Sequence, residues 1–223
     1  MTTGKELILK LKAKLNKLDT SSNRAVKPEL ALLFLNDAYI KLVRSKYSKN
    51  GGQADSTAFQ YTQLTTDELD FLTINKKSSK GDFVISKEDS EYIIDKSELE
   101  NYFIHLKASL KVKSGNTTDW TSPNYKTLDE VETSYGDPFN SSIFKDPVLY
   151  QEDNKFKIVA TDFEVVDASI SYLRKPETIT VVSEHNIPFE DELVDYTATL
   201  ILENWEDARA QSQYQVTKAA KLE

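Results

Sequence analysis

The chain has 223 residues, of which 39% are hydrophobic and 29% are charged, and its formal net charge is -8. This apolar content is too high for a disordered chain, and no run approaches the roughly 18 apolar residues that a membrane span needs. The absence of cysteine excludes disulfides, thiol catalysis and zinc sites built on thiolates, and the presence of only two histidines excludes most metal and acid–base sites.

The N-terminus has the pattern of a short helix. Thr3 and Glu6 have the spacing of a capping box, and leucines recur at helical intervals between Leu7 and Leu18. Lysines fill the other positions. This pattern predicts an amphipathic helix whose leucines dock on the body of the protein while its lysines face solvent. An arm that docks on an acidic partner is the alternative, and a helix bound to a membrane surface is a weaker one.

A second helix is expected to begin near Pro28 and to end before Gly51, because basic residues near Lys49 complement the helix dipole and glycine permits the exit of the chain. Its apolar face consists of Ala31, Phe34, Leu35, Ala38 and Leu42. A further helix is expected over residues 56–72, with a less regular period.

The middle of the chain changes to the two-residue period of β-strands. Between Tyr102 and Val112, apolar and polar residues alternate, which predicts a strand with one buried face. His105 falls on the mostly polar face and is interpreted as an exposed strand residue. Residues 114–142 are rich in turn-forming residues and are expected to form a long loop, of a kind that is often functional.

Three further strand signals follow. Residues 148–158 have the pattern of a hairpin around a polar turn at Glu152, Asp153 and Asn154. Apolar residues at even positions from Val166 to Tyr172 predict the next strand. Ile179 and Val181 indicate one more short strand after Pro176.

The segment from Ile187 to Ala210 is acidic and predicts a helix, because three carboxylates occupy its first turn, where the helix dipole favours negative charge. If it continues through the following glutamines, the helix spans about 27 residues, or roughly 40 Å. The carboxylates have three interpretations: catalytic groups, a metal site, or the solvated face of a structural helix. We favour the third, because apolar residues fill the complementary positions.

No motif for catalysis or cofactor binding is present. A metal site of the kind found in helical bundles requires a Glu-x-x-His motif, which the chain lacks. The spacing of the six glycines does not match a phosphate-binding loop. A carbohydrate-cleaving carboxylate pair and a carboxylate-only calcium or magnesium site stay open as alternatives. We therefore expect no enzyme, no cofactor and no metal.

The order of the elements is helices, then strands, then a long helix, which indicates an α+β fold. We expect a helical bundle built from the N- and C-terminal helices, with an antiparallel β-sheet lobe inserted between them. The expected parts are residues 1–75 and 184–223 for the bundle, and residues 76–183 for the lobe.

Four stretches resemble head–tail connector or ring proteins of tailed bacteriophages, specifically the crAss-like phages that infect gut Bacteroides. The resemblance covers most of the chain and is weak over residues 76–145. The turn of the type Tyr-x-Arg-Lys-Pro before an acidic helix is its most specific element. The stretches are FLNDAYIKLVRSKYSKN (34–50), STAFQYTQ (56–63), ISYLRKPETITVV (170–182) and IPFEDELVDYTATLILENWEDARAQSQYQ (187–215).

The resemblance implies a structural protein of the virion that is assembled in the host cytoplasm. Such connectors form a ring of self-associated copies, commonly twelve, beneath the portal protein, where they join the capsid to neighbouring tail or ring proteins. DNA passes through the ring without sequence-specific binding, and no membrane is involved. The family fold is a helical bundle with a β insertion, and no catalytic residues come with the resemblance.

The charge distribution suits a ring, because a closed ring requires two different faces of each copy to meet. Residues 1–50 carry a balance of +7 and residues 51–223 a balance of -15. We expect the acidic helix to line the channel or to face lysines of the next copy. The candidate residues at this interface are Lys10, Lys14, Arg44, Lys46, Glu190, Asp191, Asp195, Glu203, Glu206 and Asp207. The candidate contacts with the portal or a neighbouring ring are Tyr214, Gln215, Val216 and Lys218.

Two other classes of function remain open from the sequence. Aromatic residues in the expected loops could stack on sugars in a carbohydrate-binding or carbohydrate-active module. The residues concerned are Tyr125, Tyr135, Phe139 and Phe144. Alternatively, the protein is an adaptor that binds an acidic partner through its N-terminal lysines.

Overall fold

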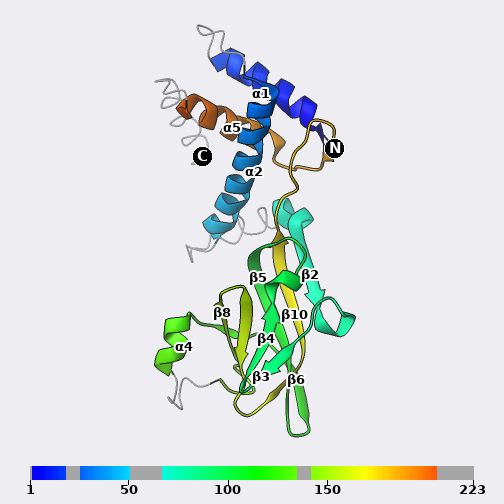
Figure 1. Ribbon diagram of the computed structural model, residues 1–223, viewed down its shortest axis with the longest axis vertical. Helices are drawn as coiled ribbons and strands as arrows, with labels where there is room; N and C mark the ends of the chain where they lie inside the picture. Colours follow the sequence, from blue (N-terminus) through cyan, green and yellow to red (C-terminus); the bar gives the residue numbers. More distant parts are fainter. Residues whose placement is uncertain (1, 19–25, 51–66, 135–141, 205–223) are drawn as a thin grey trace. The chain divides into compact units, whose positions relative to one another are not determined.

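The computed structural model describes residues 2–18, 26–50, 67–134 and 142–204 (Figure 1). The chain divides into two compact units, and each is considered by itself. The helical unit consists of Met1–Phe71 and Pro176–Glu223, so both ends of the chain contribute to it. The β unit is the continuous stretch Leu72–Lys175. The protein therefore has the α+β fold that the sequence indicates, and the two boundaries lie slightly before the expected ones.

The long helices in the described part of the helical unit are α1 (Gly4–Leu18), α2 (Pro28–Asn50) and α5 (Glu190–Asn204). The capping box of α1 is confirmed. The Thr3 amide donates to the Glu6 carboxylate at 2.8 Å, and the Glu6 amide donates to the Thr3 hydroxyl at 3.3 Å. These reciprocal bonds satisfy two amides that the first turn of a helix leaves open.

The helices bury the apolar faces that their periodicity predicts. Leu7, Leu11 and Leu15 of α1 are buried, as are four of the five predicted residues of α2, while Phe34 is partly exposed. On α5, two threonines lie among the buried apolar residues, and their hydroxyls donate to backbone carbonyls one turn back at 2.7 and 3.0 Å. The buried residues of α5 are Leu193, Val194, Thr197, Ala198, Thr199, Ile201 and Leu202.

The expected short strand at Ile179 and Val181 is wrong. Ile179 is buried, and its amide donates to the side-chain oxygen of Asn36 at 2.7 Å, while its carbonyl accepts from the amide nitrogen of Asn36 at 3.1 Å. The side chain of Asn36 thus replaces a neighbouring strand. The short strand lies further on, where β11 (Glu184–His185) pairs antiparallel with β1 (Thr2–Thr3).

The helix expected over residues 56–72 falls mostly outside the described residues. In its described last part, residues 67–69 are α-helical, as expected, and continue into a 3-10 turn, Asp70–Leu72, with Leu69 and Leu72 buried.

The β unit consists of two sheets that share one core. The strand order is β2-β10-β5-β6 in the four-stranded sheet and β3-β4-β9-β8-β7 in the five-stranded sheet. The first sheet contains β2 (Thr73–Lys77), β10 (Glu164–Arg174), β5 (Tyr102–Ser114) and β6 (Thr117–Thr121). The second contains β3 (Ser86–Glu88), β4 (Glu91–Asp95), β9 (Lys155–Val159), β8 (Val148–Glu152) and β7 (Asn124–Tyr125).

Pairing within the sheets is antiparallel, except that β7 runs parallel to β8. The shared core takes alternate residues of both sheets, among them Leu110 and Ile170 from the first and Phe156 and Ile158 from the second. The first and last strands of the unit are neighbours, with Thr73 opposite Leu173.

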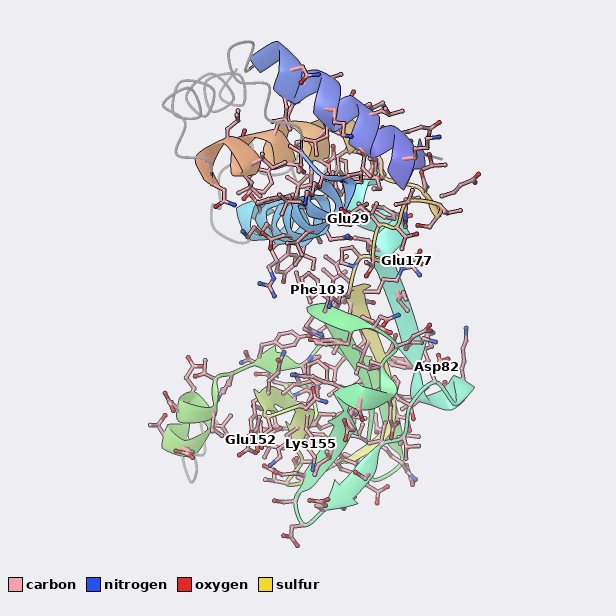
Figure 2. All side chains as sticks on the ribbon, turned by 45° about the horizontal axis from the view of Figure 1, so that its top comes forward. Glu29, Asp82, Phe103, Glu152, Lys155 and Glu177 are labelled. Carbon is pink, nitrogen blue, oxygen red and sulfur yellow. The ribbon has the colours of Figure 1, made fainter. Side chains whose placement is uncertain are left out.

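The hairpin at residues 148–158 is confirmed as β8 and β9, which end and begin at Glu152 and Lys155 (Figure 2). Asp153 lies in the turn, with φ 50°. The expected long loop over 114–142 is wrong in its described part, which contains β6, β7 and helix α4 (Leu128–Ser134). Val131 anchors α4 by packing against Val148 and Tyr150 of β8. Residues 135–141 lie outside the described residues.

Three register shifts change the expected alternation along the central strands, and they leave Val166, Leu106 and Phe103 without an opposite residue. Val166 has no opposite residue, since Val165 faces Val112 and Asp167 faces Lys111, and Val166 is 53% exposed instead of buried. Leu106 is skipped in the same way between Lys107 and His105, and it is 37% exposed. Each bulge moves the neighbouring side chains to the other face of the strand.

Gly4 is the point of closest approach between α1 and the chain before α5. A Cβ atom at this position would lie 1.9 Å from the carbonyl oxygen of Thr180. We predict that Gly4→Ala lowers the free energy of unfolding by about 1–3 kcal/mol, because the backbone must move apart. Denaturant unfolding followed by circular dichroism measures the loss. Lys5→Ala, at the next and exposed position, is the control, and equal stability of the two variants would contradict the prediction.

Candidate functional site

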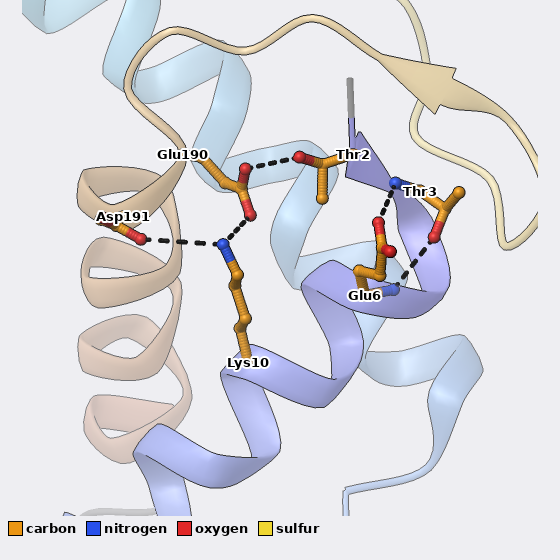
Figure 3. A network of polar contacts seen from close by, with 6 residues as sticks. All are labelled: Thr2, Thr3, Glu6, Lys10, Glu190 and Asp191. Atoms are coloured by element: carbon orange, nitrogen blue, oxygen red, sulfur yellow. Dashed lines mark hydrogen bonds and ion pairs between the residues drawn. The ribbon is translucent and has the colours of Figure 1, made fainter.

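Glu190, the first residue of α5, joins α5 to the N-terminus of the chain (Figure 3). Its carboxylate accepts from the Lys10 ammonium at 2.5 Å and from the Thr2 hydroxyl at 2.6 Å, and its side chain is only 17% exposed. Burial raises the pKa of Glu190, but the hydrogen bonds from Lys10 and Thr2 outweigh it, so the pKa lies below its usual value. Asp191 lies 4.0 Å from the same ammonium but is almost fully exposed.

A second ion pair between the same two helices lies about one turn further along each. Lys14 and Asp195 approach to 2.7 Å, and both side chains are partly exposed. Since pairs of this exposure contribute little stability each, their effect is to fix the register of α1 on α5, whose packing rests on the buried leucines.

Lys46 forms the corresponding link from α2. Its ammonium lies 2.6 Å from Glu192 and 2.7 Å from Glu68, and 4.9 Å from the centre of the Phe189 ring. The side chain is 13% exposed. Burial lowers the pKa of Lys46, but its hydrogen bonds to Glu192 and Glu68 outweigh this effect and the pKa is raised. This is the most shielded of the ion pairs in the helical unit.

The structure thus brings together, within one chain, most of the residues that we placed at an interface between copies. Lys10, Lys14 and Lys46 each bind a carboxylate of α5. Arg44 and Glu203 are exposed. That these side chains also face a neighbouring copy stays a prediction. The remaining candidates lie outside the described residues: Glu206, Asp207, Tyr214, Gln215, Val216 and Lys218.

His105 is not the exposed strand residue that the alternation indicated. The bulge at Leu106 turns it toward the core, where its ring lies 5.1 Å from the rings of both Tyr125 and Phe156. Its Nε2 is 2.9 Å from the Tyr125 hydroxyl, which also accepts from the Ala108 amide at 2.5 Å. Burial, followed by repulsion from Lys96, lowers the pKa of His105 to about 4.

Lys96 is the buried cation beside this histidine. It is 9% exposed, donates to the side-chain oxygen of Gln151 at 2.8 Å, and lies 4.8 Å from the centre of the Phe156 ring. Burial lowers its pKa. No pattern in the sequence predicts this cluster, because it depends on a bulge and on elements far apart along the chain. With His105 neutral at physiological pH, the cluster acts as a polar part of the core.

The other histidine closes a turn. His185 is buried, and its Nε2 lies 2.5 Å from the hydroxyl of Ser183. That hydroxyl also lies 2.7 Å from the Thr180 hydroxyl and accepts from the Thr180 amide at 3.1 Å. Within the same turn, the backbone carbonyl of Val181 accepts from the Lys5 amide at 3.1 Å. The serine hydroxyl is therefore engaged in the turn that holds the start of α1.

The aromatic residues considered for sugar stacking are not arranged as a platform in the described structure. Tyr125 is 46% exposed, with its hydroxyl engaged by His105 and Ala108 as above, whereas Phe144 packs against the core. Tyr135 and Phe139 lie outside the described residues. Among residues 2–18, 26–50, 67–134 and 142–204, no group of three or more His, Asp or Glu side chains is arranged to hold a metal ion.

Comparison with known proteins leaves the family open: no protein-family model matches the chain, and no curated protein matches it at a significant level. Within the described ranges, no helix is long and apolar enough to cross a membrane.

The environment of Lys46 generates a stability prediction. Lys46→Met keeps the length of the side chain but removes the shielded ammonium that lies between the carboxylates of Glu68 and Glu192. We predict that the free energy of unfolding falls by about 1–3 kcal/mol, measured by denaturant unfolding. The control is Lys41→Met, which removes a half-exposed pair with Asp37 and should cause no measurable change. An equal loss in both variants would show that the shielding of Lys46 has no effect.

The environment of His105 generates a pH prediction. The unfolded chain takes up a proton at this residue near pH 6.5, whereas the folded protein does so only near pH 4. As the pH falls through this window, the unfolded state binds more protons, so the stability falls. The His105→Gln variant lacks this titrating group, so its free energy of unfolding should depend less on pH between about 6.5 and 4. Parallel curves for the two proteins, or an NMR titration of the His105 ring near pH 6.5, would contradict the prediction.

Proposed function

We propose that this protein is a structural component of the head–tail junction of a tailed bacteriophage. Copies of the chain form a closed ring, commonly of twelve, that attaches to the portal protein and continues the DNA channel toward the tail. The protein performs no reaction in this role and holds no cofactor. The proposal starts from the four stretches that resemble connector proteins, and three of them contribute to the described structure.

The observation that carries the proposal is the layout of the chain. Both ends combine in one helical unit, and a single continuous stretch, Leu72–Lys175, forms the inserted β unit. The resemblance implies the same layout. The resembling stretches at 34–50 and 187–215 provide most of α2 and all of described α5, which pack against each other.

The use of the α5 carboxylates supports a structural role over a catalytic one. Glu190, Glu192 and Asp195 are each bound by a lysine from another helix, so these carboxylates take part in contacts between helices. The same pairs weigh against an adaptor that binds an acidic partner through Lys10 and Lys14, since both ammonium groups are already paired.

The native mass of the purified full-length chain, alone and with the portal protein, tests the proposed function. We predict a closed oligomer with a defined number of copies, visible as a ring by electron microscopy, that co-purifies with the portal. A chain that stays monomeric at every concentration and does not bind the portal would refute the proposal.

A further inference from the structure

The outer face of the four-stranded sheet carries an unusual concentration of positive charge. On β5, residues 107, 109, 111 and 113 point away from the core that Ala108, Leu110 and Val112 enter, because successive side chains of a strand alternate. Three of these four outward residues are lysines. A fourth lysine, Lys77 of β2, faces Ser169 of β10, which in turn faces Ser109, so it lies in the same surface. We call Lys77, Lys107, Lys111 and Lys113 the lysine face.

Within the described residues, none of these four lysines forms an ion pair, in contrast to Lys76 and Lys157 of the same unit. Two acidic residues lie opposite them on β10. Asp167 faces Lys111, but it is buried and accepts from the amides of Ser79 and Ala168 at 2.9 and 2.8 Å. Glu164 faces Lys113 at the end of the strand. The face thus keeps a positive balance in a chain whose net charge is -8.

The rest of the lysine face consists of small hydroxyl residues and one aromatic residue, and the 3-10 turn Ser78–Lys80 covers the part at Asp167. Between the lysines lie small hydroxyl residues, Ser109, Ser169 and Ser171, which are partly exposed. At its edge, Trp120 of β6 lies opposite Lys111 and is 46% exposed, and the ammonium of Lys77 lies 6.0 Å from its ring centre. The exposed ring of Trp120 adds apolar area beside the lysines, and tryptophan is enriched in interfaces between proteins.

The opposite side of the β unit is acidic. Helix α4 packs through Val131 onto Val148 and Tyr150, which point away from the shared core, so α4 covers the outer face of the five-stranded sheet. Figure 1 shows α4 beside β8, away from β10 and β2. Its exposed side chains include Asp129, Glu130 and Glu132, and it contains no basic residue. Nearby, Glu91 and Glu152 share Lys157 and leave one further negative charge.

We propose that the lysine face of one copy docks on the α4 side of a second copy. Because the two surfaces lie on opposite sides of the same unit, the contact is head-to-tail, which is the kind of contact that generates rings when the rotation closes. Opposite charge steers the encounter and fixes the register, while Trp120 provides apolar area at the edge. This inference names the contact surfaces of the proposed ring and rests on that proposal.

A nucleic acid is the other polyanion that such a surface could bind, since lysines and an exposed aromatic residue are features of single-strand binding sites. The acidic side of the same unit favours a second copy, because it supplies a complementary surface at the same concentration as the lysine face. It would also repel a phosphate backbone that extends around the unit.

Two charge-reversed variants of the full-length chain test the contact: Lys111→Glu with Lys113→Glu, and Asp129→Lys with Glu132→Lys. Glu130 is left unchanged because its carboxylate caps α4 by accepting from the Thr127 amide at 2.8 Å. Analytical ultracentrifugation measures self-association. Either variant alone should associate at least about tenfold more weakly than the wild type, because its two surfaces now carry charge of the same sign. An equimolar mixture should recover association, since each variant then meets a complementary surface on the other.

The control is Lys87→Glu with Lys175→Glu, two exposed lysines outside both surfaces that change the net charge by the same amount as the first variant. Its association should match that of the wild type. Circular dichroism checks that each variant is folded, and recovery in the mixture excludes misfolding as the cause of a loss. A binding assay with a single-stranded oligonucleotide runs in parallel.

The outcomes separate this inference from the proposed function. If both reversed variants form rings of wild-type mass, the proposed contact surfaces are wrong, whereas the proposed function as a ring protein is still supported. A mixture that fails to recover association would overturn the pairing of these two surfaces. Oligonucleotide binding that Lys111→Glu with Lys113→Glu abolishes, with association unchanged, would assign the face to nucleic acid. A wild-type chain that remains monomeric, alone and with the portal, would overturn both proposals.

Discussion

The helical unit depends on ion pairs that join the two ends of the chain. Lysines of α1 and α2 bind carboxylates in the first turns of α5, although about 180 residues separate Lys10 from Glu190. The buried leucines, valines and alanines supply most of the favourable free energy, but they would tolerate several rotations of one helix on another. The charged contacts select one of these arrangements, and this gives Glu190, Glu192 and Asp195 of the acidic helix a structural role.

The β unit places opposite charges on opposite sides of one core. Alternation along β5 directs lysines outward, whereas the contact of Val131 with β8 fixes an acidic helix on the other sheet. Neither feature depends on the helical unit. A chain with net negative charge can therefore present one clearly positive surface, and the overall charge alone says little about what each surface binds.

Local signals allowed much of the fold to be predicted from the sequence. The capping box at Thr3, the leucine period of α1 and the hairpin at Asp153 all act over a few residues, and all are confirmed. The bulges at Leu106 and Val166 could not be predicted, because an unpaired residue is a property of two strands together. The environment of His105 was missed for this reason. The sequence also could not show that lysines of the same chain pair with α5, because periodicity identifies the exposed face of a helix but not the residues that cover it.

The way the chain enters and leaves the β unit has a consequence for how such proteins can diversify. The first and last strands are hydrogen-bonded neighbours, so Thr73 and Leu173 lie only about 5 Å apart across the ladder. A short connection could bridge that distance, and the whole stretch could be exchanged for another module without disturbing the helices that precede and follow it. The helical unit can therefore accept different inserted domains at this position during evolution.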